Sequence, residues 1–213
     1  VVRGTWNMST IGNGHRVAVV VGASSGIGRA TATLLQNEGV FTISLARRLE
    51  NTDSTRCCDV RDEHAVMAVF RDLALQFGRL DILVNNAGLR EESNIAEMSN
   101  EEWERVMGVN LNGPFYCVRK AVPGMISEGW GRIINVSGLN AFKGRSGWSH
   151  VCASKMGALG LTRALSMELA NHGILVNHIV PGAFDTSNDG TIPAVDTSNI
   201  PVKRLGLPEE IAK

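Results

Sequence analysis

The sequence has 213 residues, which is enough for one domain with a sizeable hydrophobic core and short for two. Hydrophobic residues make up 44% and charged residues 20%, as in an ordinary soluble globular protein. The 21 basic residues equal the 21 acidic residues in number, so no basic excess favours nucleic acid or a membrane surface as a partner.

Nothing in the sequence indicates a membrane-bound or secreted protein. No apolar run is long enough to span a bilayer, and residues 1–15 lack the apolar core of a signal peptide, so we interpret them as an N-terminal extension. The adjacent Cys57 and Cys58 are expected in a buried strand, and with Cys117 and Cys152 they show no metal-ligand spacing. The sequence therefore predicts free thiols, no metal site and a cytoplasmic location.

Short β-branched or apolar runs alternate with segments of helical spacing along the chain. The predicted strands are residues 16–21, 41–45, 56–60, 81–84, 131–136 and 174–180. The predicted helices are residues 28–38, 62–77, 101–126 and 149–171, the third of them bent near Gly113-Pro114. This alternation predicts one α/β domain over residues 16–213, a doubly wound Rossmann-type parallel sheet with helices on both faces.

The first motif is the run Gly-Ala-Ser-Ser-Gly-Ile-Gly at residues 22–28, between the first strand and the first helix. Gly22, Gly26 and Gly28 permit a tight turn, and with Ile27 they let backbone N–H groups approach a pyrophosphate. The N-terminus of the following helix favours negative charge at the same place. The motif therefore predicts a dinucleotide-binding loop, and the alternative is an ordinary glycine-rich turn.

The second strand predicts which dinucleotide is bound. A carboxylate after this strand would bind the ribose 2′-hydroxyl of NAD, but here the strand is followed by Arg47 and Arg48. Two guanidinium groups suit a 2′-phosphate, and Ser24 and Ser25 offer additional hydroxyl donors. We therefore expect NADP(H) in preference to NAD(H), with a solvated basic pair on a loop as the alternative.

Further motifs occur in order along the chain. They are Asp59-Val60, Asn85-Asn86-Ala87-Gly88, Asn110 within Gly-Val-Asn-Leu-Asn-Gly, Ile-Ile-Asn-Val-Ser at 133–137, Ala-Ser-Lys at 153–155 and Pro181-Gly182. With the glycine loop, these motifs make the chain resemble the short-chain dehydrogenase/reductase family over residues 16–212. The resemblance implies an oxidoreductase that passes a hydride between a nicotinamide cofactor and a small carbonyl compound or alcohol.

The resemblance also implies a role for each matching residue. It assigns the adenine to Asp59 and Val60. It assigns the adenosine ribose to Asn86, Ala87 and Gly88. It assigns the nicotinamide carboxamide to Pro181, Gly182, Phe184 and Thr186. Lys155 would hold the nicotinamide ribose hydroxyls, and Asn110 would kink its helix and hold a proton-relay water.

The sequence departs from the family at two catalytic positions. The family keeps a tyrosine general acid four residues before the lysine, one helical turn away, and this position is Val151 here. The family serine that polarises the carbonyl lies thirteen residues before the tyrosine, and this position is Gly138. The ordinary tyrosine mechanism is therefore excluded, while Asn110 and Lys155 remain as catalytic candidates.

Two neighbouring residues are candidates to replace the missing groups. A histidine imidazole has an unperturbed pKa of about 6.5, which suits proton donation, but on a helix the His150 side chain points about 100° away from that of residue 151. Ser137 would reach the serine position after a small backbone shift. The alternative for His150 is an ordinary polar residue in the first helical turn. The alternative for Ser137 is a strand-end residue whose side chain bonds its own backbone. Tyr116 and Trp148 are more simply read as packing residues.

Two shorter-than-usual regions also stand out. Only residues 49–56 separate Arg48 from Cys57, where relatives carry a further helix. The chain ends at Lys213, before the strand that follows in relatives, so either it is a fragment or its sheet lacks that edge strand and exposes the sixth. By resemblance we expect a homodimer or a homotetramer, paired through the helices at 101–126 and 149–171.

Three functions remain open from the sequence. The first is an NADP(H)-dependent oxidoreductase acting on a carbonyl or secondary alcohol, with a substitute proton donor or a water relayed through Asn110 and Lys155. The second is a catalytically degenerate NADP(H)-binding sensor or scaffold protein. The third is a non-redox isomerase or lyase that reuses the pocket and Lys155.

Overall fold

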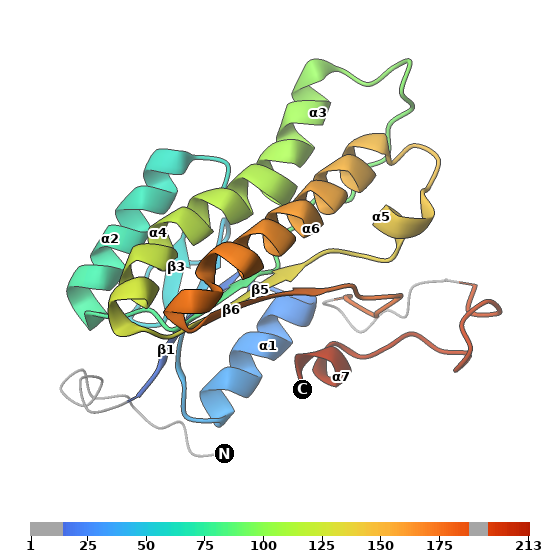
Figure 1. The fold of residues 1–213 in the computed structure, drawn as a ribbon. Helices are drawn as coiled ribbons and strands as arrows, with labels where there is room; N and C mark the ends of the chain where they lie inside the picture. Colours follow the sequence, from blue (N-terminus) through green and yellow to red (C-terminus); the bar gives the residue numbers. More distant parts are fainter. Residues whose placement is uncertain (1–14, 188–195) are drawn as a thin grey trace.

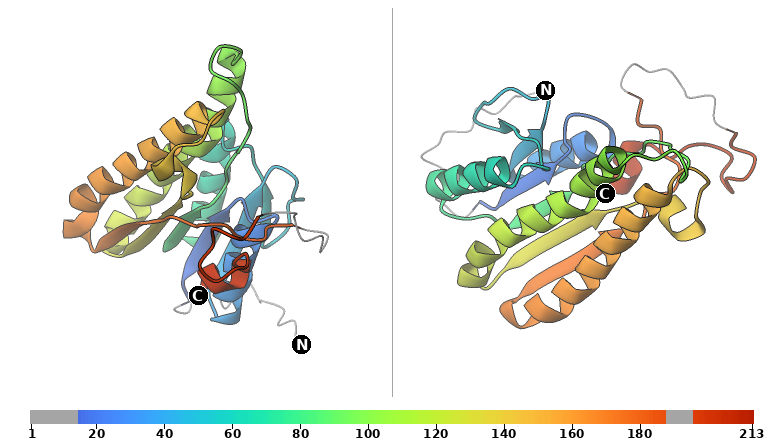
Figure 2. Two further views of the ribbon diagram at one scale, coloured as in Figure 1. Left: turned by 90° about the vertical axis from the view of Figure 1, so that its right-hand side faces the viewer. Right: turned by 90° about the horizontal axis from the view of Figure 1, so that it is seen from above.

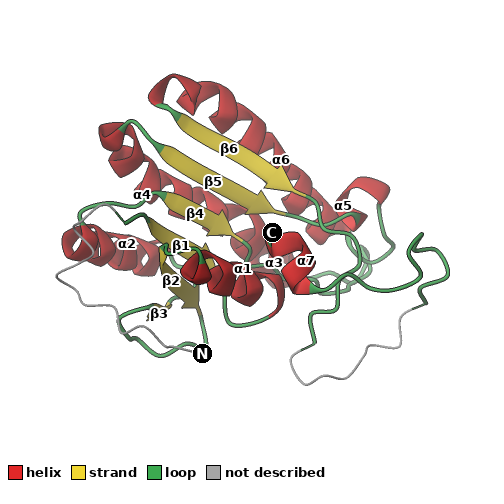
Figure 3. Cartoon of the chain, turned by 90° about the horizontal axis from the view of Figure 1, so that it is seen from below, coloured by secondary structure: helices red, strands yellow, loops and turns green. Residues whose placement is uncertain are grey.

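A six-stranded parallel sheet forms the centre of the computed structural model, which describes residues 15–187 and 196–213. The sheet order is β3-β2-β1-β4-β5-β6 (Figure 3). Strands β2 and β3 are added on one side of β1 and strands β4 to β6 on the other, so the strand order reverses between β1 and β4. The strands are β1 (Val17–Val21), β2 (Phe41–Ala46), β3 (Thr55–Cys57), β4 (Ile82–Asn85), β5 (Gly131–Val136) and β6 (Ile174–Ile179). Apart from His15, the predicted N-terminal extension lies outside the described residues.

Helices cover both faces of this sheet, which confirms the predicted doubly wound fold (Figures 1 and 2). On one face lie α2 (Glu63–Phe77), α4 (Gly113–Glu128) and α6 (Ser149–Leu169). On the other face lie α1 (Gly26–Asn37) and the short α7 (Pro208–Ala212), packed side by side. Every residue of β1 is buried, as expected for a central strand enclosed by two helical layers.

The third strand is shorter than its sequence predicts. It ends at Cys57 instead of continuing to residue 60, and Cys57 is exposed whereas Cys58 is buried. The prediction of two buried cysteines within one strand was therefore wrong for Cys57. Since β3 lies at the edge of the sheet and no helix links it to β2, its outer side has less cover than a central strand.

The predicted helix at 101–126 is in fact three helical segments. α3 (Asn100–Met107) begins with a capping box, in which Ser99 accepts from the Glu102 N–H and Glu102 accepts from the Ser99 N–H. A π-helical turn follows at Gly108–Asn112, before α4 begins. Pro114 has no N–H for the carbonyl of Asn110, its partner one turn earlier, which explains why regular α-helical bonding fails here.

The sequence pattern did not predict two short helices. These are α5 (Asn140–Lys143), which follows β5, and α7, which packs beside α1. A 3₁₀ turn (Ala170–His172) completes α6 before β6 begins. Within the described ranges, no helix is both long and apolar enough to cross a bilayer.

The outer strand β6 is only partly covered. Its residues alternate between buried and exposed at the start of the strand, and Leu175 is 50% exposed. In the described part of the chain, α1 and α7 cover the centre of their face but do not extend over β6 (Figure 3).

A row of polar side chains crosses the buried sheet. Asn85 of β4 pairs in register with Asn135 of β5, which pairs with His178 of β6. Asn85 donates to the Asn135 side chain at 2.8 Å, and Asn135 donates to the Thr162 hydroxyl of α6 at 2.9 Å. Because Thr162 donates its own proton to the Ala158 carbonyl, its 3.2 Å contact with His178 requires the Nδ1–H tautomer as donor. Burial lowers the pKa of His178, which keeps the ring neutral.

Candidate active site

A cavity of about 710 Å³ opens at the carboxyl ends of the strands, where the strand order reverses. Its lining comes from the carboxyl ends of the six strands and the loops after them, from Val109 of the π-helical turn and from the first turns of α6. This is the place where open parallel sheets bind ligands, and the volume lies in the range of cofactor pockets.

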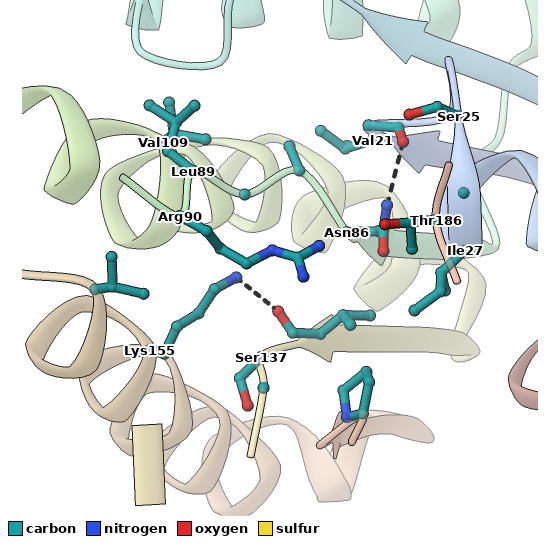
Figure 4. Close-up of a pocket in the computed structure, with 18 of the residues that line it drawn as sticks. Val21, Ser25, Ile27, Asn86, Leu89, Arg90, Val109, Ser137, Lys155 and Thr186 are labelled. Carbon is teal, nitrogen blue, oxygen red and sulfur yellow. Dashed lines mark hydrogen bonds between the residues drawn. The ribbon is translucent and has the colours of Figure 1, made fainter. Parts of the chain in front are cut away.

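The glycine loop forms one wall of the cavity, and its glycines leave no room for side chains. Gly22 has a φ of +78°, and a Cβ there would lie 2.6 Å from the Ala87 nitrogen. A Cβ on Gly28 would lie 2.2 Å from the Gly22 carbonyl oxygen and 2.5 Å from the Asn86 amide nitrogen. Asn86 donates to that carbonyl at 3.1 Å and so braces the loop (Figure 4). The Ser25 side chain makes no capping bond at the start of α1, which leaves its hydroxyl available to a phosphate.

The basic pair lies at one end of the cavity. Arg47 and Arg48 both line it and are exposed, and neither forms an ion pair with a described residue. Asp59 also lines this end, but its carboxylate binds Arg61 with an Nη2–Oδ2 distance of 2.6 Å. Hydrogen bonds from Arg61 lower the pKa of Asp59, so the carboxylate is ionised. Arg61 contacts both oxygens of this carboxylate, through its backbone N–H, Nε and Nη2, so an adenine amino group would share Asp59 with Arg61.

The other predicted cofactor residues also lie around this space. Those that line the cavity are Gly22, Ser24, Ser25, Gly26, Ile27, Val60, Asn86, Ala87, Gly88, Pro181, Gly182, Phe184 and Thr186. Gly28 lies directly behind the loop. Thr186 packs on Gly26, where an added Cβ would lie 3.1 Å from the threonine side chain. The loops after β1 and β6 therefore meet across the cavity.

Lys155 lies at the opposite end of the cavity. Its Nζ donates to the Val136 carbonyl at 2.9 Å, and the side chain is only 7% exposed (Figure 4). Burial, with a smaller contribution from the charge of Arg90, lowers the pKa of Lys155 from 10.5 to about 8. The ammonium therefore exchanges its proton readily near neutral pH.

Asn110 lies beneath this end of the cavity rather than in its lining. It is 1% exposed and sits at the centre of the π-helical turn. Its side chain accepts from the Leu89 N–H at 2.8 Å and donates to the Leu89 carbonyl at 3.0 Å and to the Ser154 hydroxyl at 3.1 Å. Asn110 thus ties the loop after β4 to the residue beside Lys155.

Of the two residues predicted to replace the missing catalytic groups, Ser137 lines the cavity and His150 does not. Ser137 lines the cavity, but its hydroxyl is buried without a hydrogen-bond partner and is turned away from Lys155 in Figure 4. His150 is fully buried outside the lining, and neither ring nitrogen has a hydrogen-bond partner. Val151 and Gly138 do line the cavity, and a Cβ on Gly138 would meet nothing within 4 Å.

Sequence reasoning missed Arg90. Its side chain extends from the loop after β4 into the cavity, toward Lys155 (Figure 4). The neighbouring charges at the rim are paired: Glu92 binds Arg145 at 3.2 Å and Glu91 binds Arg105 at 2.6 Å. The only sequence signal was a basic residue two positions after Asn-Asn-Ala-Gly, at the end of a buried strand.

A glycine loop at the reversal point of a doubly wound sheet, with a buried lysine facing it, defines a dinucleotide-binding domain of the Rossmann type. Comparison with known proteins narrows the class. The profile of the family described as short chain dehydrogenase matches residues 16–195. The chain belongs to this family of oxidoreductases, which use nicotinamide nucleotides.

The similar proteins named here act on different substrates. The 3-oxoacyl-(acyl-carrier-protein) reductase FabG of Thermotoga maritima is 35% identical, over 93% of this chain and 87% of the relative. The 2-dehydro-3-deoxy-L-rhamnonate dehydrogenase (NAD(+)) of a Sphingomonas strain is 35% identical, over 92% and 85%. The ligand-free aldohexose dehydrogenase of Thermoplasma acidophilum superposes with a TM-score of 0.86 at 31% identity, covering 93% of this chain and 84% of that one.

Proposed function

We propose that this protein is an NADP(H)-dependent oxidoreductase that interconverts a carbonyl compound and a secondary alcohol, with Lys155 as the proton-transferring group. The observation that carries the proposal is the buried ammonium of Lys155, which faces the same cavity as the glycine loop. When bound, a nicotinamide cofactor supplies or accepts the hydride.

The glycine loop fits a dinucleotide because side chains at Gly22 and Gly28 would collide with neighbouring backbone, so the loop backbone stays open to a ligand. Gly22 and Gly28 keep the backbone open, and the N-terminus of α1 behind them favours a pyrophosphate. We assign the 2′-phosphate to Arg47 and Arg48, with Ser24 and Ser25 as additional donors. We assign the adenine to Asp59 and Val60, and the ribose beside it to Asn86, Ala87 and Gly88. The nicotinamide carboxamide goes to Pro181, Gly182, Phe184 and Thr186.

The proton step has to proceed without a tyrosine. Val151 has no proton to give, and His150 does not line the cavity, so Lys155 is the strongest acid among the predicted catalytic candidates that line it. In reduction, Lys155 gives one ammonium proton to the carbonyl oxygen while the carbonyl carbon gains the hydride. In the reverse direction, the neutral amine takes the hydroxyl proton. Asn110 acts as a positioning residue, because it fixes the loop before Arg90 and the Ser154 hydroxyl beside Lys155.

The pH dependence of turnover tests the role of Lys155. Reduction requires the ammonium form, so kcat/KM should be level below pH 8 and fall about tenfold per pH unit above it. Oxidation requires the amine, so it should rise to a plateau above the same pH. Reduction is measured as NADPH consumption with a panel of ketones and aldehydes. Oxidation is measured as NADPH formation from NADP with the matching alcohols.

Controls for this test separate the three functions considered from the sequence. In Lys155→Arg the charge stays but the guanidinium does not release its proton, so reduction should fall about 10²–10⁴-fold while NADPH binding is kept. Reduction at the parent rate, with the limb still at pH 8, would assign the proton to another group. Tight NADPH binding without turnover of any carbonyl would favour a sensor or scaffold. Conversion of a substrate without cofactor consumption would favour an isomerase or lyase.

Cofactor preference is a second expected result. Arg47→Ser with Arg48→Ser should weaken NADPH binding about 10- to 100-fold and leave NADH binding unchanged, because only NADPH carries the 2′-phosphate. Fluorescence titration with both cofactors measures the two dissociation constants. Arg71→Ser, on the exposed surface of α2, is the control for loss of charge alone. Equal losses for NADPH and NADH would contradict the assignment.

A further inference from the structure

We propose that Arg90 binds a carboxylate of the substrate, so that the preferred carbonyl substrates are small oxo acids. This inference rests on the proposed function and adds the chemical class of the substrate.

Arg90 lies at the end of the cavity that holds Lys155. Gly88 and Arg90 follow β4 on the loop that passes Lys155, and a Cβ on Gly88 would lie 3.3 Å from the lysine Nζ. Arg90 lines the cavity, and its side chain points into it rather than over the rim (Figure 4). A group bound by this guanidinium would therefore lie beside the reacting carbonyl, at the opposite end of the cavity from Arg47 and Arg48.

Arg90 forms no ion pair with any residue of 15–187 or 196–213, whereas the nearby carboxylates of Glu91 and Glu92 are bound to Arg105 and Arg145. The positive charge of Arg90 is close enough to Lys155 to oppose its protonation. Two cations that face one cavity without an anion repel each other, and a bound anion would relieve the repulsion of both.

The shape of the donor group selects the anion. A guanidinium presents a planar fork that matches the two oxygens of a carboxylate. One uncompensated guanidinium balances one negative charge, which suits a monoanionic carboxylate. The glycine loop, with its own helix N-terminus, is a separate anion site on the other wall.

The test compares oxo acids with neutral partners of similar size. Pyruvate, acetoacetate and levulinate, whose carboxylates lie at increasing distances from the carbonyl, are assayed with NADPH beside their methyl esters. In the parent protein, at least one acid should exceed its ester in kcat/KM by about 10- to 100-fold. In Arg90→Met, this ratio should fall to about one through loss on the acid alone, and Arg90→Lys should restore part of it. Arg71→Met removes a remote exposed arginine and should leave the ratio unchanged.

Binding measurements keep this inference distinct from the proposed function. Calorimetric titration of the NADP-loaded protein with each acid and ester should show the same preference, and the same loss in Arg90→Met, even if no turnover occurs. Absence of turnover with an intact binding preference would reject the oxidoreductase and retain the carboxylate site. Equal binding of acids and esters by the parent would overturn the inference. It would also be overturned if Arg90→Met weakened NADPH binding as much as acid binding, because Arg90 would then be a cofactor ligand.

Discussion

Restoring a tyrosine and a serine, in the double variant Val151→Tyr with Gly138→Ser, should raise carbonyl reduction by about 10²–10⁴-fold. Position 151 lies one helical turn before Lys155 and already lines the cavity. Position 138 has no atom within 4 Å of an added Cβ, so a serine enters without displacing a neighbour. The gain follows because a phenol beside the Lys155 ammonium becomes a strong general acid. Steady-state reduction of the ketone panel with NADPH measures it.

The matched control is Val151→Phe with Gly138→Ala, which adds nearly the same bulk without either hydroxyl. Because Val151 is only 3% exposed, both variants need some local rearrangement, and the control measures that cost. Melting temperatures and NADPH dissociation constants should be alike for the two. If the hydroxyl-bearing variant is no faster than the control while both bind NADPH, positions 151 and 138 do not face the reacting carbonyl.

Adding one methyl group in Gly28→Ala should nearly abolish cofactor binding. Its Cβ would meet the Gly22 carbonyl oxygen and the Asn86 amide, and the first of these is backbone that cannot swing aside. Overpacking of this kind costs about 1–3 kcal/mol of stability. Displacement of the loop also removes backbone contacts to the pyrophosphate, each worth about 1.5–3 kcal/mol, so the NADPH dissociation constant should rise at least about 100-fold.

Gly124→Ala provides the comparison for this variant. Gly124 lies within α4, and a Cβ there meets nothing within 4 Å. The change should leave NADPH binding intact and stabilise the helix by up to about 1 kcal/mol. Denaturant unfolding and cofactor titration of both variants give the two quantities. Unchanged NADPH affinity in Gly28→Ala would show that the loop does not form the pyrophosphate site.

The order of strands and helices and the position of the glycine loop were predictable because each depends on a local pattern. The apolar run before Gly22 and the helical spacing after it are visible within a few residues. The interruption at Gly108–Asn112 was harder to place, because the sequence shows Pro114 but not which turn loses its regular bonding. The edge position of β3, which leaves Cys57 exposed, depends on the sheet order rather than on the strand itself.

The chemistry of the candidate site was less predictable, because it depends on how distant segments approach one another. Arg90 acquires its significance from Lys155, which is 65 positions later in the chain (155 minus 90). The position of His150 followed from helix geometry: neighbouring residues point about 100° apart, so a helix that turns Val151 toward the cavity turns His150 away from it. Sequence alone left that rotation open.

The polar row of Asn85, Asn135 and His178 specifies the register of strands β4, β5 and β6. Side chains alternate between the two faces of a sheet, so a one-residue slip of β5 or β6 would break the row and bury amides without partners. Asn85 directly precedes Asn86, whose side chain donates to the Gly22 carbonyl. Asn135 directly precedes Val136, whose carbonyl accepts from Lys155. Misaligned chains would thus lose the lysine anchor and the loop brace together, so correct strand pairing and an assembled cavity are expected to appear in the same folding step.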